Sequence, residues 1–292
     1  MVRPEVAVVT TVGPVHIENF PDGEEGVARA KAEIFDGIEP DGVAVLNADN
    51  RWFELLSDHA RAAGARVLSF GTGEGCDARL IDFRVPASNA VIQARLNGRS
   101  LDFPIPQTGL HWGLNSMAVL LMLEALGVGL GDGLAALGAF GPLEGRGAEK
   151  TVSLSGGAFT LIDESYNANP VSMASAIATL GARTTYGCRI VALTDMLELG
   201  PEAAAFHAGL APALEAASID LVFCAGPLMK SLWDALPATR RGGYAETAAL
   251  LAPLVASAVR PGDVVMVKGS NGSRASVIAA ALASLGHGGD KA

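Results

Sequence analysis

Polar segments follow three strand-like runs in the second half of the chain. They are IDESYNANPVSM (162–173), TDMLELG (194–200) and VKGSNGSRAS (267–276). Carboxylates at a strand end, such as Asp163 and Glu164, can bind ribose hydroxyls or a metal ion, and asparagines can bind a polar substrate. A lysine such as Lys268, beside a Gly/Ser-rich turn that opens a helix, can bind an anion. The alternative for the first segment is an Asx-rich turn whose only role is to cap a helix that begins at Pro170.

The first half offers a second set of polar residues. GPVHIENF (13–20) follows the first strand-like run and carries His16, and Lys31 lies fifteen residues further on in the helical stretch ARAKAEIF. Residues just beyond the carboxyl end of a strand lie where open α/β sheets bind ligands. Taken separately, a hydrogen-bonded structural histidine and a solvated lysine are the plainer interpretations.

Two further motifs lie near the middle of the chain. GLHWGLNSMA (109–118) carries His111 and Asn115 four residues apart, which places them on one helix face. They could hold a purine edge or simply complete the start of the helix. EGRG (144–147) places Arg146 at the expected boundary between the two domains. Its guanidinium could bind a phosphate there, or the segment could be a flexible Gly-rich linker in which the arginine has no special role.

Short β-branched runs alternate with Ala-rich stretches of helical length, which predicts parallel βαβ units. The runs are VAVVTTV (6–12), VAVL (43–46), RVLSF (66–70), IVAL (190–193), LVFCA (221–225) and VVMVKG (264–269). Between about Asp77 and Pro106, three strand-like runs joined by PASN and NGR predict an antiparallel meander. We therefore expect an α/β protein with residues 1–146 as one domain and 147–292 as a second, Rossmann-like domain.

Composition limits the classes of partner. The 292 residues include 21 Lys and Arg against 31 Asp and Glu, a net charge of -10, so no broad basic face is expected to bind nucleic acid. The three cysteines lie far apart without metal-ligand spacing, as expected for a reducing cytoplasm. No apolar run approaches the ~18 to 20 residues that cross a bilayer, so we expect no membrane insertion.

Together these motifs resemble the Mur ligase family, in order and over nearly the whole chain. Within it they resemble the MurF branch, which joins D-alanyl-D-alanine to UDP-N-acetylmuramoyl-tripeptide during peptidoglycan synthesis; the specific motifs are DESYNANP and DMLELG. The DNPR motif and the His-containing turn typical of the diaminopimelate-adding branch do not occur. The resemblance implies a Mur ligase central ATPase domain followed by the family's C-terminal domain, in a cytoplasmic enzyme that is monomeric at full length.

The resemblance also implies roles for single residues. ATP would phosphorylate the carboxylate of the UDP-linked peptide, and the incoming amine would attack the acyl phosphate. His16 and a carbamylated Lys31 would bind Mg²⁺, and Lys268 would act at the transferred phosphate. The residues implied to contact ATP are His111, Asn115, Arg146 and either Asp163 or Glu164. Those implied to lie near the amino substrate are Asn167, Asn169 and Ser270.

The sequence departs from the family pattern in three places. His111-Trp112 stands where HN is common, and Thr194-Asp195-Met196 stands where GDM is common. The largest departure is that no GxxxxGK followed by Ser or Thr occurs, although the family carries this phosphate-binding loop before the first motif found here. We expect an N-terminally truncated chain, without that loop and the UDP-binding domain, that is inactive alone. The alternatives are a folylpolyglutamate-synthetase-like ligase and a non-catalytic nucleotide-binding or interaction module.

Overall fold

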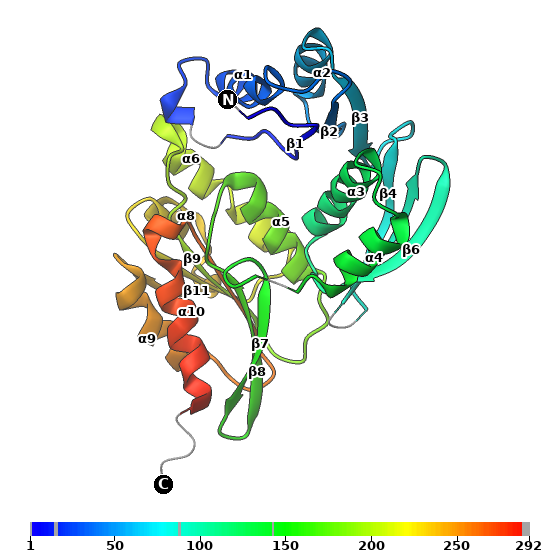
Figure 1. The fold of residues 1–292 in the computed structure, drawn as a ribbon. Coiled ribbons are helices and arrows are strands. Elements are labelled where there is room, and N and C mark those ends of the chain that lie inside the picture. The colour runs from blue at the N-terminus through cyan, green and yellow to red at the C-terminus, as the bar shows by residue number, and fades with distance from the viewer. Residues whose placement is uncertain (1, 15–16, 87–88, 142, 288–292) are drawn as a thin grey trace. The chain divides into compact units, whose positions relative to one another are not determined.

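The computed structural model describes residues 2–14, 17–86, 89–141 and 143–287. Contacts divide the chain into two compact units, residues 1–141 and 142–292. Each unit contains one six-stranded sheet. The sheets and helices of the two units can be followed by colour in Figure 1. The domain boundary expected between residues 146 and 147 remains a prediction.

The sheet of the first unit has its strands in chain order, β1 to β6. Their bounds are β1 Val6–Val9, β2 Val43–Asn47, β3 Arg66–Gly71, β4 Ala78–Arg84, β5 Ala90–Leu96 and β6 Arg99–Ile105. Strands β1 to β4 pair in parallel, and β4, β5 and β6 pair antiparallel. The predicted parallel sheet with an antiparallel meander is therefore confirmed, and the meander continues the sheet at β4.

Helices cover both faces of this sheet. They are α1 Glu24–Ala32, α2 Phe53–Ala62, α3 Leu110–Ala125 and α4 Leu130–Ala139. One core cluster joins α1 and α2 to the sheet through Val27, Leu56 and Leu46, and the other joins α3 through Met117 and Ile92. Strand β2 is buried on both faces, because its side chains enter both cores.

The sheet of the second unit has the order β11-β10-β9-β12-β8-β7. Its bounds are β7 Ala148–Leu154, β8 Gly157–Glu164, β9 Arg189–Thr194, β10 Leu221–Ala225, β11 Arg241–Ala245 and β12 Val264–Lys268. All neighbours are parallel except β7 and β8, which form a hairpin. Strand β11 was not predicted, because RGGYA has none of the β-branched residues that mark the other strands.

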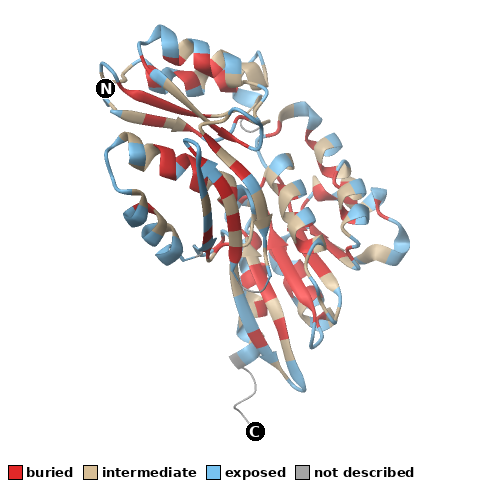
Figure 2. Ribbon diagram, turned by 90° about the vertical axis from the view of Figure 1, so that its right-hand side faces the viewer, coloured by how far each residue is buried: buried red, intermediate tan, exposed pale blue. Residues whose placement is uncertain are grey.

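Two layers of helices bury the faces of this second sheet. They are α5 Pro170–Gly181, α6 Ala203–Ala208, α7 Ala211–Ala216, α8 Met229–Ala235, α9 Ala248–Ala258 and α10 Ala275–Ser284. Helices α5 to α8 contribute to one core cluster, and α9 and α10 to the other. Figure 2 shows long buried stretches in the strands of this layered structure. The central strands are thus buried on both faces, and their carboxyl ends can position polar side chains.

Short 3₁₀ segments complete the described structure: Ile17–Asn19, Glu33–Phe35, Gly200–Glu202, Ala238–Arg240, Asn271–Ser273 and Leu285–His287. Within the described ranges, no helix combines the length and the apolar character that a membrane span requires.

Candidate active site

The polar segments of the second unit meet at one edge of its sheet. Strand β12 lies between β8 and β9 and is parallel to both. Lys268, at the end of β12, is in register with Glu164 on one side and Leu193 on the other. The segments after β8, β9 and β12 therefore start beside one another, as their positions after strand-like runs predict.

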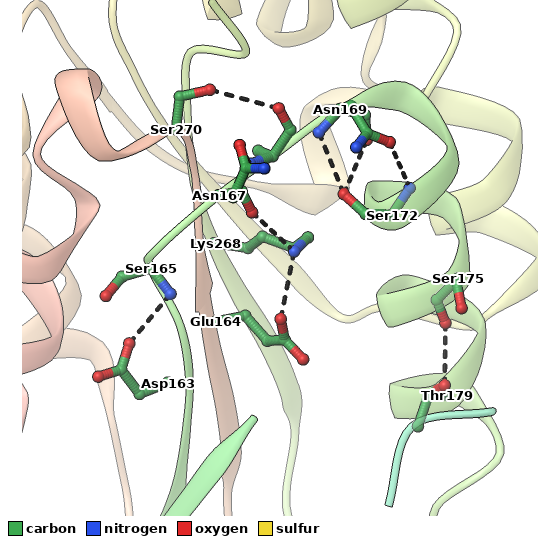
Figure 3. A network of polar contacts seen from close by, with 11 residues as sticks. Asp163, Glu164, Ser165, Asn167, Asn169, Ser172, Ser175, Thr179, Lys268 and Ser270 are labelled. Carbon is green, nitrogen blue, oxygen red and sulfur yellow. Dashed lines mark hydrogen bonds and ion pairs between the residues drawn. The ribbon is translucent and has the colours of Figure 1, made fainter. Parts of the chain in front are cut away.

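Lys268 is the charged centre of this edge. Its Nζ lies 3.2 Å from Oε2 of Glu164 and donates to the backbone oxygen of Asn167 at 3.0 Å. Only 3% of Lys268 is exposed, and Glu164 retains 17% of its side-chain exposure. Figure 3 shows the ammonium group between these two partners. The fold therefore fixes a buried ammonium group, with an anionic partner, where two strands end.

Asp163 points away from this ion pair, because successive strand residues face opposite sides of the sheet (Figure 3). Its carboxylate accepts a hydrogen bond from the Ser165 amide at 3.0 Å, as in an Asx turn. With Tyr166 and Asn271 it lines an open pocket of about 720 Å³ beside α10. The two adjacent carboxylates thus face separate environments.

Arg146 lies beside the same pocket. Its guanidinium stacks over the ring of Tyr166, 4.0 Å from the ring centroid. Two backbone hydrogen bonds join the turn that carries Arg146 to the end of β8. The Tyr166 amide donates to the Gly145 backbone oxygen at 3.0 Å, and the Gly147 amide donates to the Asp163 backbone oxygen at 2.8 Å. An arginine guanidinium can bind a phosphate, and a tyrosine ring can stack against a nucleotide base. The role of Tyr166 could not be predicted from the sequence, because it and Arg146 lie 20 positions apart in the chain.

Asn169 performs the capping role that was the plainer interpretation of its segment. Its side chain accepts from the Ser172 amide at 2.9 Å, and the Ser172 hydroxyl accepts from the Asn169 amide at 3.1 Å. This reciprocal pair is a capping box at the start of α5, where Pro170 follows. Asn167 contributes its backbone oxygen to Lys268, and its own side chain accepts from the Ala168 amide.

We expect Asn169→Ala to lower the free energy of unfolding by about 1 kcal/mol, the usual cost of losing such a cap. Asn169→Ser should retain most of that stability, because serine is also a good cap. Urea unfolding of the two variants measures this difference. Equal loss in both would contradict the capping role. Loss of amino-substrate binding in a stable Asn169→Ser variant would support the predicted substrate contact.

Ser270 connects the β12 turn to the segment after β9. Its hydroxyl accepts from the Leu197 amide at 3.0 Å and donates to the Ala168 oxygen at 3.3 Å. Asp195 is buried, and its carboxylate accepts from the Met229 amide at 2.8 Å. Burial raises the pKa of Asp195 above its usual range. Asp195 therefore holds the start of α8, and Ser270 holds the two polar segments together.

The predicted magnesium ligands of the first unit are His16 and Lys31. Lys31 is exposed in the last turn of α1, and its predicted partner His16 lies outside the described residues. Among the side chains that the structure does describe, no group of three or more His, Cys, Asp or Glu could hold a metal ion. The magnesium site stays a prediction.

His111 and Asn115 lie one turn apart in α3, His111 exposed and Asn115 half-buried. Two asparagines at and just after the carboxyl end of β2, Asn47 and Asn50, have a structural role that was not predicted from the sequence. Asn47 donates to the Thr10 oxygen at 3.0 Å, and Asn50 donates to the Val12 oxygen at 2.8 Å. They fix the segment after β1, at the carboxyl edge of this sheet.

Comparison with known proteins gives two family matches. Residues 1–123 match the Mur ligase middle domain, and residues 150–271 match the Mur ligase glutamate ligase domain. The chain is 30% identical over 278 residues to the UDP-N-acetylmuramoyl-tripeptide--D-alanyl-D-alanine ligase of Bacillus subtilis, covering 94% of this chain and 58% of that protein. It is also 30% identical over 285 residues to the UDP-N-acetylmuramate--L-alanine ligase of Saccharopolyspora erythraea, covering 91% and 56%.

Solved structures agree with these relatives. MurF from Acinetobacter baumannii superposes with a TM-score of 0.83 at 26% identity, covering 97% of this chain and 60% of that one. The Mycobacterium tuberculosis folylpolyglutamate synthase shares the fold, with a TM-score of 0.72 at 22% identity, covering 100% of this chain and 66% of that one. The chain spans less than two thirds of the length of the curated relatives described above. With the middle domain followed by the glutamate ligase domain, the chain belongs to the Mur ligase family.

Proposed function

We propose that the chain is part of a MurF-type ligase, which uses ATP to join D-alanyl-D-alanine to UDP-N-acetylmuramoyl-tripeptide in the cytoplasm. The observation that carries the proposal is the carboxyl edge of the second unit, where buried Lys268 is paired with Glu164 beside the Asn-rich segment. The similarity to the Bacillus subtilis D-alanyl-D-alanine ligase supports the choice of substrates.

In the proposed reaction, the peptide carboxylate attacks the γ-phosphorus of ATP, and ADP leaves. The amine of D-alanyl-D-alanine then attacks the acyl carbon and forms a tetrahedral intermediate, which expels phosphate as the amide forms. Negative charge develops on oxygen in both steps, so a fixed ammonium such as Lys268 stabilises it. Glu164 partly neutralises the charge of Lys268, so the two side chains form a dipole that the fold holds in place. Asn167, Asn169 and Ser270 are proposed to lie beside the incoming amine.

The nucleotide contacts are proposed for both units. In the second, Asp163 would accept from ribose hydroxyls, and Arg146 would bind phosphate. In the first, His111 and Asn115 would contact the adenosine, while His16 and a carbamylated Lys31 would hold Mg²⁺. A carbamate replaces the positive charge of lysine with the oxygen ligands that Mg²⁺ prefers. Because the 292 residues contain no GxxxxGK[ST], we also propose that the chain alone has negligible turnover.

Binding of ADP to Asp163→Asn tests the nucleotide contact. The asparagine oxygen can still accept from the Ser165 amide, so the strand end should remain intact. The loss of a charge-assisted hydrogen bond to ribose should weaken binding about tenfold. Isothermal calorimetry measures this, with Asp234→Asn as the control because Asp234 is exposed and pairs only with nearby Lys230 among the described ion pairs. Unchanged affinity in Asp163→Asn would contradict the role.

An L-alanine-adding ligase is a second candidate, because the Saccharopolyspora erythraea relative is equally identical over a similar length. The two candidates differ in the amine that the second unit must bind. A glutamate-adding activity, as in folylpolyglutamate synthase, would require a third kind of amine. Binding of the three amines therefore separates these activities, and binding of none would favour a non-catalytic module.

A further inference from the structure

A wholly buried imidazole lies outside the residues assigned to the reaction. His207, in α6, has 0% exposure. Its Nε2 lies 2.9 Å from the Met196 amide nitrogen, and its Nδ1 lies 2.6 Å from the Ala203 backbone oxygen. An amide N–H can only donate, and a carbonyl can only accept. Nε2 must therefore accept, Nδ1 must carry the proton, and the ring must be neutral.

Burial favours the same neutral ring and outweighs the Ala203 hydrogen bond and the nearby Asp195 carboxylate, which both act to raise the pKa. It lowers the pKa of His207, because a charged imidazolium would be poorly solvated inside the unit. Protonation of Nε2 would also place an N–H against the Met196 N–H. The environment thus selects one protonation state and one tautomer.

The Met196 amide belongs to the segment that contacts the β12 turn. The preceding residue, Asp195, accepts from the Ser270 amide at 3.2 Å through its backbone oxygen. The following residue, Leu197, donates its amide to the Ser270 hydroxyl at 3.0 Å. His207 thus binds Met196, and the residues on either side of Met196 both form hydrogen bonds with Ser270. Ser270 lies two residues after Lys268.

A purely space-filling role does not account for these contacts. An apolar side chain of similar size would fill the site but leave the Met196 N–H without this acceptor, at the cost of an unsatisfied buried donor. Both ring nitrogens are used, and each contact requires its particular donor or acceptor.

We infer that His207 is a positioning residue, whose neutral, Nδ1-protonated ring holds residues 195–197 against the turn that carries Lys268 and Ser270. The inference rests on the proposed function in assigning Lys268 and Ser270 to the reaction. The hydrogen-bond path itself stands on the contacts of the second unit alone. His207 touches no substrate in this arrangement and acts only through the segment.

The unmodified chain provides the first test. Long-range ¹H–¹⁵N NMR at neutral pH should show His207 as the neutral tautomer with the proton on Nδ1. An imidazolium, or a proton on Nε2, would overturn the inference. This spectrum needs no variant and is decisive even if substitutions at this buried position prevent folding.

Variants provide the second test. His207→Leu should raise hydrogen exchange at the Met196, Leu197 and Ser270 amides about tenfold. His207→Gln, which keeps an acceptor oxygen, should restore most of the protection. His59→Gln is the matched control, since His59 is a partly exposed histidine of the first unit. Unchanged exchange in a folded His207→Leu would contradict the inference.

Binding of D-alanyl-D-alanine separates this inference from the proposed function. A folded His207→Leu should bind it more weakly than His207→Gln does. If the unmodified chain does not bind D-alanyl-D-alanine, the proposed function fails, whereas the tautomer and the exchange data still decide whether His207 holds the segment. If both variants bind it as well as the unmodified chain, the positioning role is contradicted.

Discussion

Replacing Lys268 by methionine should lower the free energy of unfolding of the second unit by about 3 kcal/mol, as expected when one partner of a buried ion pair is lost. The variant leaves the Glu164 carboxylate, 17% exposed, without its cation and the Asn167 oxygen without its donor. Urea unfolding followed by Trp233 fluorescence, in a background with Trp52→Phe and Trp112→Phe, reports on this unit.

Two controls distinguish the buried ion pair from a general loss of charge. Lys230→Met removes an exposed pair with Asp234 and should cost only roughly 0–1 kcal/mol. Glu164→Gln in the Lys268→Met background should recover part of the stability, because the unpaired charge is removed. A Lys268→Met variant as stable as Lys230→Met would mean that the pair contributes little to the fold.

Gly269→Ala should be the most damaging single methyl addition at this edge. A Cβ there would lie 1.7 Å from Oγ1 of Thr194, a hydroxyl that also contacts Ser273 at 2.5 Å. The backbone on which Lys268 and Ser270 depend would have to shift, at a cost of roughly 3 kcal/mol. Scanning calorimetry should then show the transition of the second unit lowered by roughly 6–12 °C.

The control for this substitution is Gly73→Ala, where an added Cβ meets no atom within 4 Å. It should leave both transitions unchanged. Thr194→Ala combined with Gly269→Ala should recover part of the loss, because the closest atom is removed while the Thr194 Cβ position, 3.0 Å away, remains close. Equal melting temperatures for Gly269→Ala and Gly73→Ala would contradict the steric argument.

The fold was largely predictable because its determinants are local. Strands β2, β9, β10 and β12 are nearly continuous apolar runs, as required of strands buried on both faces. Strand β11 lacked that signal because two glycines interrupt it and it pairs only at one side, with β10. Its strand geometry depends on a neighbour rather than on its own residues.

The meeting of the polar segments at one sheet edge was predictable, whereas the contacts of each side chain were less so. Alternation along β8 sends Asp163 to the pocket and Glu164 to Lys268, a division that an adjacent acidic pair does not reveal. Asn169 forms a cap at the start of α5, and its predicted contact with the substrate stays a prediction. Tyr166 and His207 gave no signal, since their partners Arg146 and Met196 are fixed by tertiary structure.

The central claim is that the second unit binds the amine substrate of a D-alanyl-D-alanine-adding ligase. The most direct measurement is a titration of the ¹⁵N-labelled chain with D-alanyl-D-alanine, L-alanine and L-glutamate, followed by NMR. The account predicts that only D-alanyl-D-alanine shifts the amide signals of Asn167, Lys268 and Ser270 in a saturable way. Saturable shifts of these signals by L-alanine or L-glutamate, with none from D-alanyl-D-alanine, would contradict it.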